Sequence, residues 1–225
     1  RPAQMLIVTK LQRPGVATDY LHRPRLYAAL DAGRNRKLTL ISAPAGYGKS
    51  SLVASWLEMT GAAHVWYSID RSDSDLNLFL GYLLAGLQQI VPKSCPRLGA
   101  LLQGTDLPPI DYIAASLVND LNEFGSPFTI VLDDFHLIDN PSTLELIDSL
   151  LRYMPRGMQL LLTTRQDPPL PLVKLRARQE IAELRMQDLR FSDEEVVVFL
   201  RQSLPGRAAD ATINLVSEKT EGWPV

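Results

Sequence analysis

Glycine, lysine and serine side by side in a short loop indicate chemistry with a phosphate group. Gly48, Lys49 and Ser50 fill fixed positions of the pattern G-x-x-x-x-G-K-[ST], and Ala43 stands where the first glycine is usual. Glycines let successive N–H groups turn inward around a phosphate, and a following helix adds its positive end. The lysine reaches the β- and γ-phosphates, and the serine hydroxyl can ligate Mg²⁺. We therefore predict a triphosphate-binding loop rather than an ordinary glycine-rich turn.

We expect the whole loop to surround the nucleotide. Its aromatic member, Tyr47, has two interpretations, because it either covers the phosphates or packs against the core. The predicted nucleotide-binding residues of the loop are Ala43, Pro44, Ala45, Gly46, Tyr47, Gly48, Lys49, Ser50 and Ser51.

Two adjacent carboxylates follow a buried strand further along the chain. Residues 128–132 form an unbroken apolar run, which is typical of a strand covered on both faces, and Asp133 and Asp134 end it. Burying two carboxylates is costly unless a cation or a proton transfer uses them. Together with the loop, this is the Walker B pattern. We predict that Asp133 holds Mg²⁺ with Ser50, and that Asp134 positions or deprotonates the attacking water.

A third charged residue follows the apolar run 159–164. In P-loop ATPases of the additional-strand type, this strand lies between those carrying the phosphate loop and the paired carboxylates, so Arg165 would sense the γ-phosphate. The catalytic residues predicted are Asp134, Lys49 and Arg165. His22, His64 and His136 are too scattered for a metal site, although His136 follows the carboxylates closely enough to line the same site.

The elements that position these residues alternate between strands and helices. Apolar runs at 38–41, 64–69, 128–132, 159–164 and 181–184 predict five strands, and segments with helical spacing separate most of them. Asp70, Asp73 and Asp75 invite a metal interpretation, but a polar loop and a helix cap at Asp75 explain them more simply. The fold class predicted is α/β, a P-loop NTPase with a five-stranded parallel sheet of the additional-strand type, followed by the start of a small helical domain.

Three regions divide the chain. Residues 1–37 are a lead-in segment, extended over 6–14, and residues 38–187 are the nucleotide-binding domain. Residues 92–109 form a polar link, and prolines at 168–171 break the chain. Residues 188–225 begin a truncated helical lid domain, where Ser192 and Glu195 fit a capping box and further helix is expected over 208–219.

Composition excludes several classes of protein. The net charge is −2, which gives no electrostatic grip on nucleic acid, and the single cysteine excludes an internal disulfide framework. No apolar run approaches membrane-spanning length and no signal peptide is visible, so we expect a cytoplasmic protein without a membrane partner. A chain that begins at Arg1 and stops at Val225 looks like a piece of something longer.

Several motifs together resemble one family across essentially the whole chain. The chain is similar to the N-terminal nucleotide-binding module of MalT-like transcriptional activators, which are large LuxR-type regulators of the STAND class of signal transduction ATPases. The motifs are TKLQRP at 9–14, RPRL at 23–26, SAPAGYGKS at 42–50, WYSID at 66–70, IVLDDFH at 130–136 and EGWP at 221–224.

This resemblance implies properties that the spacing of residues in the sequence does not indicate. Such regulators switch from an ADP-bound monomer to an ATP-bound oligomer when an inducer binds, and they reach the inducer and promoter DNA through regions absent here. Pro224 matches the proline of the STAND Gly-x-Pro motif, which touches the adenine, and Arg23 falls where the family has an arginine close to the nucleotide. The departures are Ala43 and the chain end directly after Pro224.

The predicted function is an ATP/ADP switch with slow Mg²⁺-dependent hydrolysis that controls oligomerisation of a transcription regulator. An alternative is a motor acting on nucleic acid, because residues 133–136 superficially resemble a helicase Asp-Glu-x-His box, but no basic track is found. A GTPase is disfavoured because no Asn-Lys-x-Asp motif is present. A degenerate binder that holds nucleotide only for structure is the third alternative, and the intact carboxylates argue against it.

Overall fold

A parallel five-stranded sheet organises the computed structural model, which describes residues 5–203. The strands lie in the order β2-β3-β4-β1-β5, and every neighbouring pair is parallel. Their bounds are β1 Leu38–Ser42, β2 His64–Ser68, β3 Phe128–Asp133, β4 Met158–Thr164 and β5 Ile181–Arg185. The five-stranded α/β fold predicted from the apolar runs is therefore confirmed.

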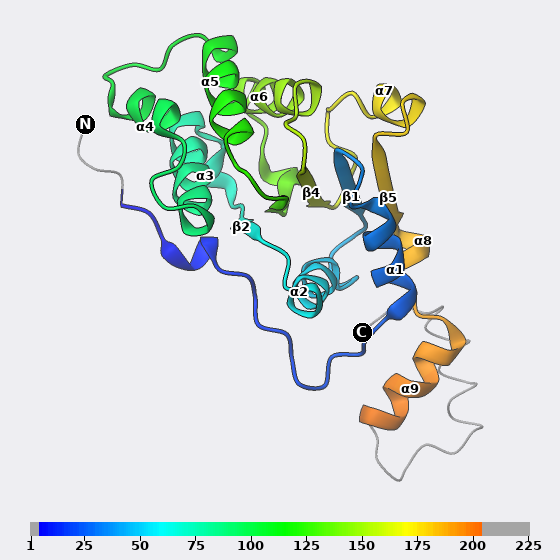
Figure 1. The fold of residues 1–225 in the computed structure, drawn as a ribbon. Helices are drawn as coiled ribbons and strands as arrows, with labels where there is room; N and C mark the ends of the chain where they lie inside the picture. The colour runs from blue at the N-terminus through cyan, green and yellow to red at the C-terminus, as the bar shows by residue number, and fades with distance from the viewer. Residues whose placement is uncertain (1–4, 204–225) are drawn as a thin grey trace.

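The strands are buried on both faces because successive side chains point to opposite sides of the sheet. Leu38 and Leu40 of β1 belong to one core cluster, and Ile41 belongs to the other. Helices cover both faces, so the molecule has three layers (Figure 1). The first cluster packs against α3 Leu76–Ile90, α4 Pro96–Gln103, α5 Ile110–Asn122, α6 Pro141–Arg152 and α7 Leu172–Ala177. The second packs against α1 Pro24–Gly33, α2 Lys49–Thr60 and α8 Met186–Leu189.

The strand order brings the predicted functional segments to one edge. β4 lies between β1 and β3, as the additional-strand arrangement requires. Because all strands run parallel, the loops that follow β1, β3 and β4 emerge at the same carboxyl-terminal edge. Ligands of open α/β sheets bind at this edge.

Several short helices were not expected from the sequence, and three of them lie in segments predicted to be extended, to be a polar link or to be broken by prolines. The segment 6–14 was predicted to be extended, but Val8–Leu11 forms a 3₁₀ turn whose Leu11 is buried. The polar link contains α4, where the Asp120 carboxylate accepts a 2.9 Å hydrogen bond from the Leu98 N–H and buried Leu98 anchors the helix. α7 follows the prolines at 168–171 directly. Contacts with distant residues stabilise these short helices, so local patterns do not reveal them.

The chain beyond β5 becomes helical. α9 spans Asp193–Ser203, and its capping box forms as predicted, because Ser192 and Glu195 exchange hydrogen bonds of 3.0 and 3.2 Å. α9 stands beside α1 and apart from the sheet (Figure 1). The helix expected over 208–219 lies outside the described residues. Within residues 5–203, no helix is long and apolar enough to cross a membrane.

Candidate functional site

The loop between β1 and α2 has the geometry of an anion cradle. Gly46 and Gly48 take positive φ angles of 84° and 68°, which glycine adopts without strain. A Cβ added at Gly48 would meet no atom within 4 Å, so the loop leaves open space there. α2 begins at Lys49, and the N-terminal N–H groups of a helix favour negative charge.

Lys49 lies inside this loop rather than in solvent. Its Nζ donates hydrogen bonds of 2.9 Å to the carbonyl oxygens of Ala43 and Pro44. Burial lowers the pKa of Lys49, and the nearby charge of Arg165 adds to that decrease, whereas Asp134 and Asp133 oppose it. The loop carbonyls therefore hold the Lys49 ammonium inside the loop, within electrostatic reach of Asp133, Asp134 and Arg165.

Asp133 ends β3 in a buried position next to Ser50. Its Oδ1 accepts hydrogen bonds from the Ser50 hydroxyl at 2.7 Å and from the Thr163 hydroxyl at 2.5 Å. Burial raises the pKa of Asp133 despite these two bonds. A buried carboxylate beside a hydroxyl offers the oxygen ligands that Mg²⁺ prefers, and a bound cation would offset the cost of burial.

Asp134 differs from its neighbour in both direction and exposure. It adopts a left-handed φ of 59°, and its N–H donates to the Thr163 hydroxyl at 3.0 Å. Its side chain is 41% exposed, and its Oδ1 lies 3.7 Å from Nδ1 of His136. Burial lowers the pKa of His136, and its buried Nδ1 has no hydrogen-bond partner. A carboxylate that faces solvent next to a neutral imidazole can orient a water molecule or accept its proton.

Arg165 follows β4 at the same edge and is exposed. Its positive charge lowers the pKa of both Lys49 and His136, which places it within electrostatic reach of both. The structure therefore brings together the predicted residues Lys49, Ser50, Asp133, Asp134 and Arg165.

Arg23 lies in a different environment from Lys49, Ser50 and the two aspartates. It is 4% exposed, and its guanidinium donates to both Glu195 Oε2 and the carbonyls of Leu189 and Arg190. It also stacks 4.7 Å from the ring of Phe191. Arg23 thus ties the lead-in segment to the start of α9. Pro224, the other residue predicted to be near the adenine, lies outside the described residues.

A cavity of about 290 Å³ adjoins the phosphate loop, and Arg23 lines it. The loop contributes Gly46, Tyr47, Gly48 and Ser51 to its wall. The lead-in segment, the residue pair before α9 and the middle of α9 complete it with aromatic side chains, namely Tyr20, Phe191 and Phe199. Aromatic walls next to a phosphate cradle suit a planar base.

Sequence reasoning missed Thr163, Phe191 and Phe199. Thr163 holds both aspartates, and the only sequence signal for it is its position two residues before Arg165. Phe191 directly precedes the capping box at Ser192, and nothing local to Phe191 or Phe199 indicates a cavity wall.

The other predicted acidic residues have structural roles in the described part of the chain. Asp70 caps a 3₁₀ turn at Arg71–Ser74, and fully buried Asp73 pairs with Lys10 at 2.6 Å. Asp75 caps α3, as predicted. Among residues 5–203, no group of three or more His, Cys, Asp or Glu side chains is placed to hold a metal ion.

Fold and strand order give the chain the architecture of P-loop NTPases of the additional-strand type. It matches no protein-family model. The predicted resemblance to MalT-like regulators is confirmed, since the chain is homologous over nearly its whole length to HTH-type transcriptional regulators named MalT. It is 35% identical over 97% of its length to those of Yersinia enterocolitica and Serratia proteamaculans. The chain spans 24% of the length of these relatives.

Solved structures share the fold at low sequence identity. A STAND protein with a tetratricopeptide repeat sensor from Pyrococcus horikoshii superposes with a TM-score of 0.69 at 18% identity, covering 100% of this chain and 30% of that one. Cdc6p from Pyrobaculum aerophilum gives 0.56 at 16% identity, with 95% and 58% covered. A Walker-type ATPase of Pyrococcus abyssi gives 0.55 at 15% identity, with 97% and 68% covered.

Proposed function

We propose that this chain is the nucleotide-dependent switch of an inducer-responsive transcriptional activator. It binds ATP or ADP with Mg²⁺ and hydrolyses ATP slowly. The observation that carries this proposal is the meeting of Lys49, Ser50, Asp133 and Asp134 at one edge of a P-loop sheet.

The phosphate chain lies in the cradle of residues 43–51 in this proposal. Lys49 exchanges its two loop carbonyl partners for phosphate oxygens, which gives a buried cation a stronger, charge-assisted bond. Gly46 and Gly48 aim backbone N–H groups at the same oxygens, and the start of α2 adds its dipole.

Ser50 and Asp133 hold Mg²⁺, which neutralises charge on the phosphates when bound. Thr163 keeps Asp133 pointing toward Ser50 through its hydroxyl. Asp134 orients the attacking water and accepts its proton, supported by His136. Arg165 reads the γ-phosphate from the end of β4.

The aromatic cavity beside the loop receives the adenine base. Tyr20, Phe191 and Phe199 offer ring faces, and Arg23 forms part of the wall. Because Arg23 also binds Glu195, nucleotide in this cavity is coupled to the position of α9. Such coupling is what a switch needs, because a ligand shifts an equilibrium only through unequal affinity for the two states.

The transcription-regulator relatives favour a switch over a motor on nucleic acid. In the full-length protein we propose self-association in the ATP state, with inducer and promoter DNA bound by regions outside this chain. A nucleic-acid motor would instead show hydrolysis stimulated by DNA or RNA.

The test is to extract and identify the nucleotide retained after purification, and then to titrate ADP, ATP and GTP calorimetrically. We expect adenine nucleotide in the extract, binding of ADP and ATP, and no displacement by GTP. Lys49→Ala should abolish binding because it removes the phosphate-binding cation. If wild type and Lys49→Ala bind adenine nucleotides equally well, or if neither binds any, the proposal is wrong.

A further inference from the structure

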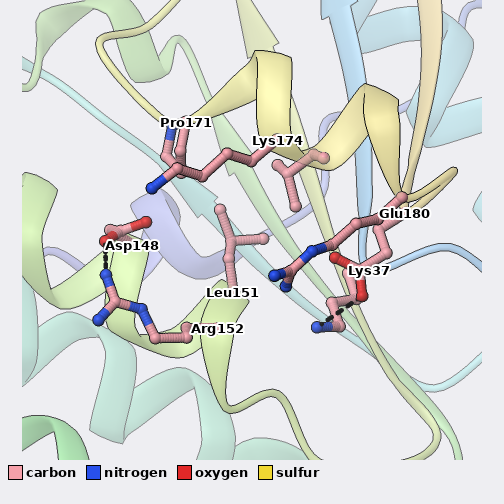
Figure 2. A pocket seen from close by; sticks show the side chains of 9 residues that line it. Lys37, Asp148, Leu151, Arg152, Pro171, Lys174 and Glu180 are labelled. Carbon is pink, nitrogen blue, oxygen red and sulfur yellow. Dashed lines mark hydrogen bonds and ion pairs between the residues drawn. The ribbon is translucent and has the colours of Figure 1, made fainter.

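A second pocket lies at the amino-terminal edge of the sheet, the edge opposite the phosphate loop. It has a volume of about 250 Å³. Its walls come from segments far apart in the sequence: the residue before β1, the end of α6, and α7 with the turn leading into β5 (Figure 2). The proposed nucleotide site uses none of these residues.

Cationic side chains converge on this pocket although the chain as a whole carries a net charge of −2. Four of them, Lys37, Arg152, Lys174 and Arg178, line it. The apolar side chains of Leu151 and Leu175 separate them, and Figure 2 shows Leu151 projecting between Arg152 and Lys174.

Two of these four cations are already neutralised. Lys37 pairs with Glu180 at 3.0 Å, and Arg152 pairs with Asp148 at 2.8 Å. Within the part of the chain that the structure describes, Lys174 and Arg178 form no ion pair. The pocket therefore keeps an excess of two positive charges.

The two unpaired cations come from the same short segment and line the same pocket. They are four residues apart across the end of α7, so their side chains leave the same face one turn apart. Lys174 is exposed, and its side chain extends across the pocket toward Asp148 of α6 (Figure 2). Unpaired surface cations are common, but these two line a pocket whose walls include the buried core residues Leu151 and Leu175. An arginine offers a planar fork that binds phosphate or carboxylate through two parallel bonds.

We propose that this pocket binds a small dianion with a neutral or apolar body. Two negative charges match the unpaired Lys174 and Arg178, and the body lies against Leu151 and Leu175. A phosphate monoester and a short dicarboxylate share this chemistry. The site is distinct from the nucleotide site because it occupies the opposite edge of the sheet.

The experiment titrates the full-length protein with glycerol 3-phosphate, succinate and acetate by calorimetry at near-physiological and at high salt. We expect at least one dianion to bind, acetate to bind at least tenfold more weakly, and high salt to weaken dianion binding because the charges are partly exposed. If only one of the two dianions binds, the result shows whether the pocket prefers a phosphate monoester or a dicarboxylate.

Substitutions at the pocket, at distant surface positions and at Lys49 test whether the dianion binds at this pocket. Lys174→Ala with Arg178→Ala should weaken dianion binding at least tenfold, whereas Arg71→Ala with Lys93→Ala removes the same charge from two distant positions and should change it less than twofold. Lys49→Ala should leave dianion binding intact, so failure of the nucleotide proposal would not affect this test. Unchanged melting temperatures without ligand exclude misfolding.

Three outcomes would overturn the proposal. Neither dianion binds in the millimolar range, acetate binds as tightly as the dianions, or the double variant at α7 binds them as tightly as wild type does. The last two outcomes would mark the interaction as an adventitious ion only.

Discussion

At the scale of single residues, adjacent side chains of the same type have different environments. Asp133 is 6% exposed and bound by two hydroxyls, whereas the side chain of Asp134 is 41% exposed. The left-handed turn at Asp134 produces this difference, because it takes the second side chain out of the strand direction. One carboxylate is therefore suited to a cation and the other to a water molecule.

Asp134→Asn should separate binding from hydrolysis. The amide keeps the shape of the side chain but can neither accept a proton nor carry negative charge. We expect single-turnover ATP hydrolysis by the full-length protein to slow at least about 100-fold, the lower end for loss of a general base. ATP affinity should change little.

The control for this prediction is Asp111→Asn, which neutralises an exposed carboxylate at the start of α5 and should hydrolyse at the wild-type rate. Hydrolysis by Asp134→Asn at that same rate would contradict the role proposed for Asp134.

At the scale of elements, one buried cluster fastens the lead-in segment to α9. Glu195 accepts hydrogen bonds from Arg23 at 2.9 and 3.1 Å and from Arg25 at 3.0 Å, across about 170 residues of sequence. Burial alone would raise the pKa of Glu195, but the two arginines hold it below its usual range. The docking of α9 therefore depends on the charge of one carboxylate.

This dependence predicts that α9 detaches in acid. A carboxyl group with a lowered pKa in the folded state contributes stability above its unfolded pKa of about 4.3, and loses that contribution as the pH falls through the lowered value. We expect NMR signals of α9 amides to report undocking below about pH 4, while α2 amides remain native.

The matched variant is Glu195→Gln. It should undock α9 at neutral pH, with a local cost of about 3 kcal/mol for leaving Arg23 buried without its counter-charge, and it should show no further acid transition in α9. An α9 that stays docked in this variant would show that the ion pair is dispensable.

The elements also show what sequence can and cannot predict. The five strands were predictable because each is a short apolar run. The meeting of Lys49, Ser50 and the two aspartates at one edge was predictable because each motif is local in sequence. Thr163, the Arg23–Glu195 pair and the Figure 2 pocket were not, because residues far apart in the chain create them. α4 shows the same limit, since its start depends on the Asp120 carboxylate of α5.

At the scale of the whole molecule, the sheet has two chemically different edges. The carboxyl-terminal edge carries the glycine-containing loop 43–51 and the paired aspartates, and the amino-terminal edge carries the cationic pocket. Helices bury both faces, so the edges are the places where the sheet can meet ligands. The N-terminal and C-terminal segments of the described chain meet at the Arg23–Glu195 cluster, among other contacts, beside the first of these edges.

Nucleotide bound at that edge should stabilise the whole chain. A ligand that binds only the folded state adds about 2.7 kcal/mol at 100 times its Kd. For a domain of this size that corresponds to a rise in Tm of about 5–10 °C, which calorimetric melting with ADP and Mg²⁺ would measure. Lys49→Ala and wild type with GTP serve as controls, because neither should form the complex and both should melt at the ligand-free temperature. An equal rise with GTP would mean that the aromatic cavity of Tyr20, Phe191 and Phe199 does not select the base, and that the phosphate cradle alone determines affinity.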